Sequence, residues 1–121
     1  MVLRKIGLGF KNQKVFLDVK VCSNIFSMMR GLMFRRQNSA PALFFDFGKD
    51  GSHRIHSYFV FFPFLAIWIN SSGKIVDFKM VKSFESSVLP KEPFSRLIEI
   101  PMNRFYSDII LLLVGKIKRF K

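Results

Sequence analysis

The sequence is poor in residues that form covalent or metal-based cross-links. It has one cysteine and two histidines among 121 residues. A single cysteine cannot form a disulfide within the chain, which suits a reducing compartment, so we expect a cytoplasmic protein. Cys22 follows the apolar residues Val19 and Val21, and we expect its thiol to be buried and inert. His53 and His56 would lie on opposite faces of a strand, so we predict no metal site and no cofactor.

Acidic residues are also scarce. Eight Asp and Glu residues stand against twenty Lys and Arg residues, which gives a formal net charge of +12. This excess favours anionic partners such as nucleic acid, a phosphorylated ligand or an anionic membrane surface, and the alternative is a solvated, lysine-rich surface. One local basic run provides candidate polyanion contacts, namely Lys116, Lys118, Arg119 and Lys121.

Long hydrophobic runs are missing as well. The most apolar stretch, residues 58–69, has about a dozen residues, well under the roughly 20 that a membrane-spanning helix needs. Pro63 interrupts this stretch, and β-branched and aromatic residues fill it. We therefore expect buried strands and no membrane span, and no signal peptide is visible.

The abundant residue is phenylalanine. Half of the residues are hydrophobic, and sixteen of them are Phe. Such a composition predicts a folded domain with a substantial core, and the length favours one domain over residues 1–121. Sixteen rings are many for so small a core, so we expect some at the surface, where an apolar patch marks a partner or a ligand.

Hydrophobic periodicity predicts mostly strands. Residues 14–21 alternate cleanly, whereas Ile25, Met29 and Leu32 recur at helical spacing after a candidate cap at Ser23. Further strands are predicted at residues 43–47, 54–61, 64–69, 74–81, 97–100 and 109–114, with a hairpin turn at 70–73. The fold class is thus mainly β (α+β): a small sandwich or barrel of about seven short strands, with one short helix at residues 23–32.

Several segments match one known family in order. They are Arg30-Gly31-Leu32-Met33-Phe34-Arg35, Leu43-Phe44-Phe45, Ile55-His56, Phe61-Phe62-Pro63, Ile67-Trp68-Ile69-Asn70, Gly73-Lys74-Ile75-Val76 and Ile98-Glu99-Ile100-Pro101. Together they resemble the domain of unknown function 192, an uncharacterised protein family, and the arrangement looks most like its archaeal members. The resemblance implies a compact, mainly β domain with one short helix, and it implies no activity.

The chain departs from the family pattern at several polar positions. Leu65, Asn70 and Lys116 stand where family members usually have acidic residues, so any site that depends on those carboxylates is in doubt. Asn103 stands where the family usually has a turn glycine. Asparagine tolerates the left-handed backbone conformation better than most residues, so this change is expected to be mild.

Four residues form a candidate polar site, namely Arg30, Arg35, His56 and Glu99. Glu99 lies between two isoleucines in a predicted strand, and a lone carboxylate there is unfavourable unless it is paired. We predict that Glu99 forms an ion pair with Arg30 or Arg35 or a hydrogen bond to the backbone, and the functional alternative is a polar floor to a ligand pocket. His56 matches the family's histidine, although a histidine satisfied beside a strand is the simpler interpretation.

Catalytic constellations are not recognisable in the sequence. It has no glycine-rich phosphate loop, and its few carboxylates are scattered. The favoured hypothesis is therefore a non-enzymatic ligand-binding or accessory protein with a preference for anionic partners. The alternatives are a non-specific nucleic-acid-binding protein, because basic and aromatic residues interleave, and an enzyme of unassigned chemistry.

Overall fold

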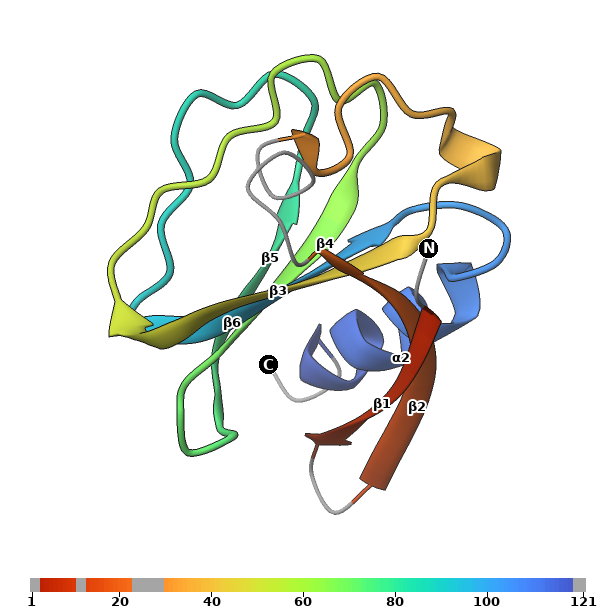
Figure 1. Cartoon of the computed structure of the whole chain (residues 1–121). Coiled ribbons are helices and arrows are strands. Elements are labelled where there is room, and N and C mark those ends of the chain that lie inside the picture. The colour runs from red at the N-terminus through yellow and green to blue at the C-terminus, as the bar shows by residue number, and fades with distance from the viewer. Residues whose placement is uncertain (1–2, 11–12, 23–29, 119–121) are drawn as a thin grey trace.

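One curled, six-stranded sheet organises the molecule (Figure 1). The computed structural model describes residues 3–10, 13–22 and 30–118. The strands are β1 (Leu3–Phe10), β2 (Gln13–Cys22), β3 (Ala42–Gly51), β4 (Phe64–Ile69), β5 (Ile75–Val81) and β6 (Phe94–Pro101). A short 3-10 helix η1 (Gln37–Ser39) precedes β3, and helix α2 (Ser107–Lys118) follows β6.

The order of the strands places β6 in the interior of the sheet. The order is β1-β2-β3-β6-β4-β5, so β6 joins the three strands β1 to β3 to the hairpin β4–β5. Strands β2 and β3 are parallel, and the other neighbouring pairs are antiparallel. The sheet curls into a half-barrel, which leaves one face for α2 and the other face for long loops (Figure 1).

Each face of the sheet carries its own hydrophobic core. On one face, Ile110 and Leu113 of α2 pack with buried aliphatic residues from β1, β2, β3, β4 and β6. On the other face lies an aromatic core around Trp68, Phe64 and Phe94. Three loops, at residues 30–41, 52–63 and 82–93, contribute to this second core. Strand β4 contributes to both cores, which is why all six of its residues are buried.

Much of the predicted β structure is confirmed, and two predicted strands are wrong. The strand at 64–69 coincides with β4, and those at 14–21, 43–47, 74–81 and 97–100 fall on or nearly on β2, β3, β5 and β6. Residues 109–114 lie in α2 instead of a strand, because a short continuous apolar run has no period that separates the two structures. Residues 54–61 form an irregular loop with a single bridge from Ile55 to Val88.

The number of strands and the place of the helix also need correction. The sheet has six strands rather than seven, and the strand β1, which carries Gly7 and Gly9, was not predicted. The predicted helix at 23–32 lies mostly on residues 23–29, outside the described residues, and the described α-helix follows the last strand. Among the described residues, no helix combines the length and apolar character needed to cross a bilayer.

Asn103 orders the turn that leads into α2. Its side-chain Oδ1 accepts hydrogen bonds from the backbone N–H groups of Phe105 (3.0 Å) and Tyr106 (3.2 Å). Its Nδ2 donates to the carbonyl oxygens of Gln37 (2.7 Å) and Ala40 (3.1 Å). The backbone of Asn103 is not left-handed, so the expected reason for tolerating asparagine here is wrong. The buried side chain instead ties the start of α2 to the loop before β3.

Ser57 fixes the loops that cover the aromatic core. It is fully buried, its hydroxyl donates to the Lys82 carbonyl, and it accepts from the Glu85 N–H at 2.6 Å. Its carbonyl also accepts a hydrogen bond from the Phe84 N–H at 2.9 Å. These bonds join the loop at 52–63 to the loop at 82–93, so the two loops form one layer over the sheet.

Three phenylalanines in these loops have a left-handed backbone. Phe34, Phe59 and Phe84 have φ values of 59°, 60° and 61°, and within the described part of the chain they are the non-glycine residues with positive φ. This conformation costs about 1–2 kcal/mol for a residue with a Cβ atom. The Phe34 N–H donates to the Phe59 carbonyl at 2.9 Å, so the strained residues lie in hydrogen-bonded loops.

Candidate functional site

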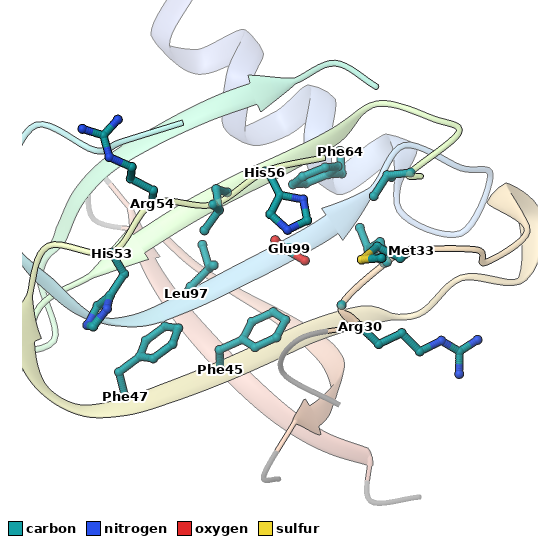
Figure 2. A pocket seen from close by; sticks show the side chains of 14 residues that line it. Arg30, Met33, Phe45, Phe47, His53, Arg54, His56, Phe64, Leu97 and Glu99 are labelled. Carbon is teal, nitrogen blue, oxygen red and sulfur yellow. The ribbon is translucent and has the colours of Figure 1, made fainter. Parts of the chain in front are cut away.

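A pocket of about 300 Å³ opens between the sheet and the covering loops. Strands β3, β4 and β6 form its base, and the segments 30–33 and 53–60 form its sides (Figure 2). Its walls are mainly apolar, and their larger side chains are Leu32, Met33, Phe45, Phe47, Phe64 and Leu97. The volume lies at the lower end of the range found for small-molecule sites.

Glu99 forms the polar floor of this pocket. It lies on β6, where its neighbours across the sheet are Leu43 on β3 and Ala66 on β4. Its side chain points into the pocket between the sheet and the loops (Figure 2), and only 7% of the residue is exposed. Among the described residues, no hydrogen bond or ion pair reaches its carboxyl group.

Gly31 gives this carboxyl group its space. Gly31 has φ of +51°, and a Cβ atom at this position would lie 3.4 Å from the Glu99 Oε1 atom. A residue with a Cβ atom would be strained by this positive φ, and its Cβ would be in van der Waals contact with the carboxyl oxygen. The glycine in the Arg30-Gly31-Leu32 segment thus allows the loop backbone to approach the pocket floor closely.

Burial makes Glu99 a neutral acid near pH 7. Desolvation raises the pKa of its carboxyl group from the usual 4.5 to about 8. A protonated carboxyl group offers one O–H donor and also accepts hydrogen bonds, so it suits a neutral polar group on a ligand. A ligand cation would instead favour the ionised form.

Among the described residues, Glu99 has neither the predicted ion pair nor a hydrogen bond to the backbone. Arg35 uses its Nε to donate to the Gly31 carbonyl at 3.0 Å, and Arg30 is exposed with its guanidinium pointing away from Glu99 (Figure 2). Burial, together with the neighbouring Arg30, lowers the pKa of Arg35. The prediction failed because spacing along the sequence does not fix the direction of a long side chain after a turn.

The two histidines lie on opposite parts of the pocket rim. His53 stacks on Phe47 with ring centroids 4.8 Å apart, so its ring extends the aromatic wall. His56 lies above Glu99 in the view of Figure 2, and its Nδ1 accepts a hydrogen bond from the Tyr58 N–H at 3.3 Å. Both residues are exposed, so they can meet a ligand as it enters.

The rim is cationic. Arg30 and Arg54 are exposed beside the opening, and Arg54 donates to the Ser87 hydroxyl at 2.7 Å. Of the four residues in the sequence-based polar site, Arg30, His56 and Glu99 line this pocket, whereas Arg35 does not line it and donates to the Gly31 carbonyl. The pocket therefore combines a neutral acidic floor, apolar walls and a cationic rim.

The basic run is placed only in part. Lys116 and Lys118 belong to the last turn of α2, and their side chains are not described. Arg119 and Lys121 lie outside the described residues. The run is helical up to Lys118, which ends α2. Its role as a polyanion contact stays a prediction.

A second hollow, of about 450 Å³, lies beside strand β1. Arg4, Lys5, Arg96 and Asp46 line it, and the Nε atom of Arg96 lies 3.7 Å from Oδ2 of Asp46. This ion pair is largely solvated, so the hollow contains the kind of surface charge that water already satisfies. The Glu99 pocket differs because its polar group is buried and has no partner in the part of the chain that the structure describes.

Sequence reasoning missed several residues of the site. Ser57 orders the rim loops, Gly31 makes room for Glu99, and His53 belongs to the aromatic wall. Gly31 lies in the most specific of the matched segments, so that signal was available. No local sequence pattern predicts the role of Ser57, because its hydrogen-bond partners are 25 and 28 residues away along the chain.

The comparisons with known proteins settle the family. The model of DUF192, described as an uncharacterized ACR, matches residues 8–110. The chain belongs to this family. The DUF192 model thus covers every strand that lines the pocket and extends into α2. No curated protein matches the chain.

Two solved structures share the DUF192 fold seen here. A candidate transcription regulator from Sinorhizobium meliloti 1021 is 22% identical, with a TM-score of 0.70 over 82% of this chain and 79% of that one. A protein of unknown function from Novosphingobium aromaticivorans DSM 12444 is 12% identical, with a TM-score of 0.72 over 88% of this chain and 77% of that one. At these identities the likeness shows the fold alone.

Proposed function

We propose that this DUF192 domain is a non-enzymatic binding protein for a small amphiphilic anion. The observation that carries the proposal is the carboxyl group of Glu99, which is buried on the floor of an apolar pocket and has no partner among the described residues. A buried polar group without a partner is unfavourable, and a ligand that hydrogen-bonds to it removes that penalty.

The three parts of the pocket define the ligand's chemistry. A hydroxyl or amide group would meet the neutral carboxyl of Glu99, and an aromatic or aliphatic body would fill the space beside Phe45 and Leu97. A carboxylate or phosphate would stay at the rim near Arg30 and Arg54, where a fork of N–H donors suits such groups. This arrangement accounts for the predicted preference for anionic partners.

Matched probes can test each part separately. We suggest binding measurements by ligand-observed NMR with phenylacetate, 4-hydroxyphenylacetate and 4-hydroxyphenylacetamide. The hydroxyl group should improve affinity by on the order of tenfold, as a hydrogen bond inside a dry site does. Glu99→Leu should remove this difference, whereas Glu99→Gln should retain much of it. Arg54→Ala should weaken the two carboxylates and leave the amide unchanged.

The control variant is Arg96→Ala in the second hollow, which should bind all three probes as the native protein does. If no probe binds at millimolar concentration, or if Glu99→Leu leaves the effect of the hydroxyl group intact, the proposal is wrong.

A second candidate function is non-specific binding of nucleic acid. Two exposed phenylalanines each have a cation over the ring: Lys14 Nζ lies 5.7 Å from the Phe16 centroid, and Arg104 Cζ lies 5.5 Å from the Phe105 centroid. Exposed rings with adjacent cations resemble the stacking platforms of single-strand binding proteins. The basic run supplies further candidate contacts at Lys116, Lys118, Arg119 and Lys121.

A salt series with single- and double-stranded nucleic acid tests this candidate. The logarithm of affinity should fall linearly with the logarithm of salt concentration, by about one unit per neutralised phosphate. Neutralising the four cations of the basic run should flatten the slope. If the slope is the same in these variants, the basic run is not part of the binding surface. If no nucleic acid binds at low salt, the protein does not have this second candidate function.

Three further proposals rest on the sequence. They are a single domain over residues 1–121, an archaeal type of family member, and a cytoplasmic location that follows from the single cysteine. Limited proteolysis tests the first, because one domain should resist cleavage between β3 and β4 as well as elsewhere.

A further inference from the structure

Four exposed phenylalanines gather in the loops that cover the aromatic core. Phe34, Phe59, Phe61 and Phe84, here called the phenylalanine cluster, are 62%, 47%, 59% and 51% exposed. Phe34 stacks on Phe59 with centroids 5.0 Å apart, and Phe61 meets Phe84 edge-on at 5.6 Å. The rings come from three different loops, so the fold assembles one continuous apolar patch from separate segments.

The backbone holds these rings outward at some cost. Phe34, Phe59 and Phe84 are the three non-glycine residues of positive φ among those described. Hydrogen bonds from Phe34 N–H to Phe59 carbonyl and from Phe84 N–H to Ser57 carbonyl hold the loops in this form. Asparagine or glycine would fit these backbone positions without strain, yet each is a large apolar residue. The coincidence of strain and exposure marks the cluster as an interaction surface.

The loops that carry the cluster are rich in basic residues. The three loops that carry it, at residues 30–41, 52–63 and 82–93, contain six Lys and Arg residues and two Glu residues. Arg35 and Arg36 directly follow Phe34, and Lys82 precedes Phe84 by two positions. An apolar patch carried by basic loops is complementary to a surface that is negative outside and apolar below.

We propose that the phenylalanine cluster docks the protein on an anionic lipid bilayer. The rings enter the boundary between headgroups and acyl chains, and the basic residues of the same loops contact the headgroups. The protein lies on the membrane and does not cross it. This inference goes beyond the small-molecule pocket, because it stands on the four rings of the phenylalanine cluster, and none of them lines that pocket.

The net charge of the chain and the type of aromatic residue in the cluster favour lipid over a second copy of the chain or another protein. A second copy of this chain would bring another net charge of +12 to the contact, and like charges oppose self-association. Protein interfaces favour Tyr, Trp and Arg at their centres, because those side chains combine apolar area with a polar group. The four rings of the cluster have no polar atom. Such rings can enter the hydrocarbon of a bilayer, but they cannot hydrogen-bond to the surface of a partner protein.

Flotation with vesicles tests the proposal. Vesicles of phosphatidylcholine alone are compared with vesicles that contain about 30% phosphatidylserine, at low and at physiological salt. We expect binding to the anionic vesicles, weakened by salt. The double variant Phe34→Asn/Phe59→Asn should lower the partition coefficient by at least about tenfold, because it removes two apolar anchors and keeps the charge. Asparagine also accepts the left-handed backbone, so the variant should fold.

A matched control uses exposed apolar residues elsewhere. Leu111 and Leu112 on α2 are 64% and 42% exposed, close to the values for Phe34 and Phe59. Leu111→Gln/Leu112→Gln should bind vesicles as the native chain does. Phe61→Trp provides a second readout in a folded protein: its emission should shift to the blue on anionic vesicles, whereas buried Trp68 gives a constant background.

Three results would overturn the proposal. The first is equal loss of binding in both double variants, which would mean that apolar surface of any kind suffices. The second is unchanged binding in Phe34→Asn/Phe59→Asn, which would reduce the interaction to charge. The third is the absence of vesicle binding at low salt. If the native chain also forms a dimer in sedimentation experiments and the Phe34→Asn/Phe59→Asn variant does not, the cluster is a self-association surface.

Discussion

At the scale of single residues, the burial of Glu99 disfavours the charged form of its carboxyl group. Its carboxyl group lies among apolar neighbours on β6 and lacks a partner among the described residues. The folded protein therefore holds a proton that the unfolded chain releases, because the pKa is about 8 in the fold and near 4.5 without it. Whenever the folded state binds more protons than the unfolded state, stability falls as pH rises.

This difference in pKa predicts a pH-dependent stability with a definite window. The contribution of Glu99 is fully favourable below pH 4.5 and is lost as pH rises towards 8. Across this window, the free energy of unfolding should fall by at most about 1.4 kcal/mol per pH unit. Glu99→Gln should flatten that part of the curve in denaturant titrations and be more stable than the native protein at pH 8. An equally steep curve in the variant would contradict the assigned burial.

Gly73 offers a test of backbone freedom alone. It occupies the turn between β4 and β5 with φ of +84°, as the sequence predicts for a hairpin turn, and a Cβ atom there would meet nothing within 4 Å. Gly73→Ala should therefore destabilise the protein by about 1 kcal/mol through backbone strain only. Gly73→Asn should cost less in the same thermal or chemical unfolding experiment. Equal losses in both variants would show that strain is not the cause.

At the scale of elements, the different exposure of two leucines shows that α2 has the periodicity of a helix and not of a strand. A strand over residues 109–114 would put residues 111 and 113 on the same face, but the helix buries Leu113 and leaves Leu111 64% exposed.

Leu113→Ala should consequently cost about 2–5 kcal/mol of stability, since it opens a cavity in the core under α2. Leu111→Ala should change the free energy of unfolding by less than about 0.5 kcal/mol. Losses of equal size would favour the strand that the sequence alone predicts.

The elements show where local patterns are sufficient and where they are not. Strand β4 was predicted with the observed bounds because its six apolar residues sit between Pro63 and a clear turn at 70–73. Residues 54–61 have the same aromatic and β-branched composition but do not form a strand. There the rings of Phe59 and Phe61 face solvent, and distant hydrogen bonds through Ser57 replace strand pairing.

The candidate site was predictable in its residue types but not in its contacts. The position of Glu99 between two isoleucines indicated burial correctly, and Arg30 and His56 do lie at the same pocket. The partner of Glu99 was predicted wrongly, since Arg35 is held by the Gly31 carbonyl. Such choices depend on side-chain direction and loop geometry, which arise only when segments far apart in sequence meet.

At the scale of the whole molecule, charge is poorly compensated. The described residues contain one ion pair, between Arg96 and Asp46, against a net charge of +12. Repulsion among the cations opposes the compact state, and added salt screens it. Raising sodium chloride from low to physiological concentration should therefore increase the free energy of unfolding, by on the order of 1 kcal/mol. A decrease with salt would show that unrecognised ion pairs dominate.

The interior position of β6 has a consequence for synthesis on the ribosome. Strands β1 to β3 and the hairpin β4–β5 are made first, but the strand that joins them, Phe94–Pro101, is made after both. Until it emerges, β3 and β4 each present an unpaired edge rich in apolar side chains, which is the usual starting point for aggregation. A nascent chain that stalls before residue 94 should therefore require a chaperone, whereas one released after α2 should not.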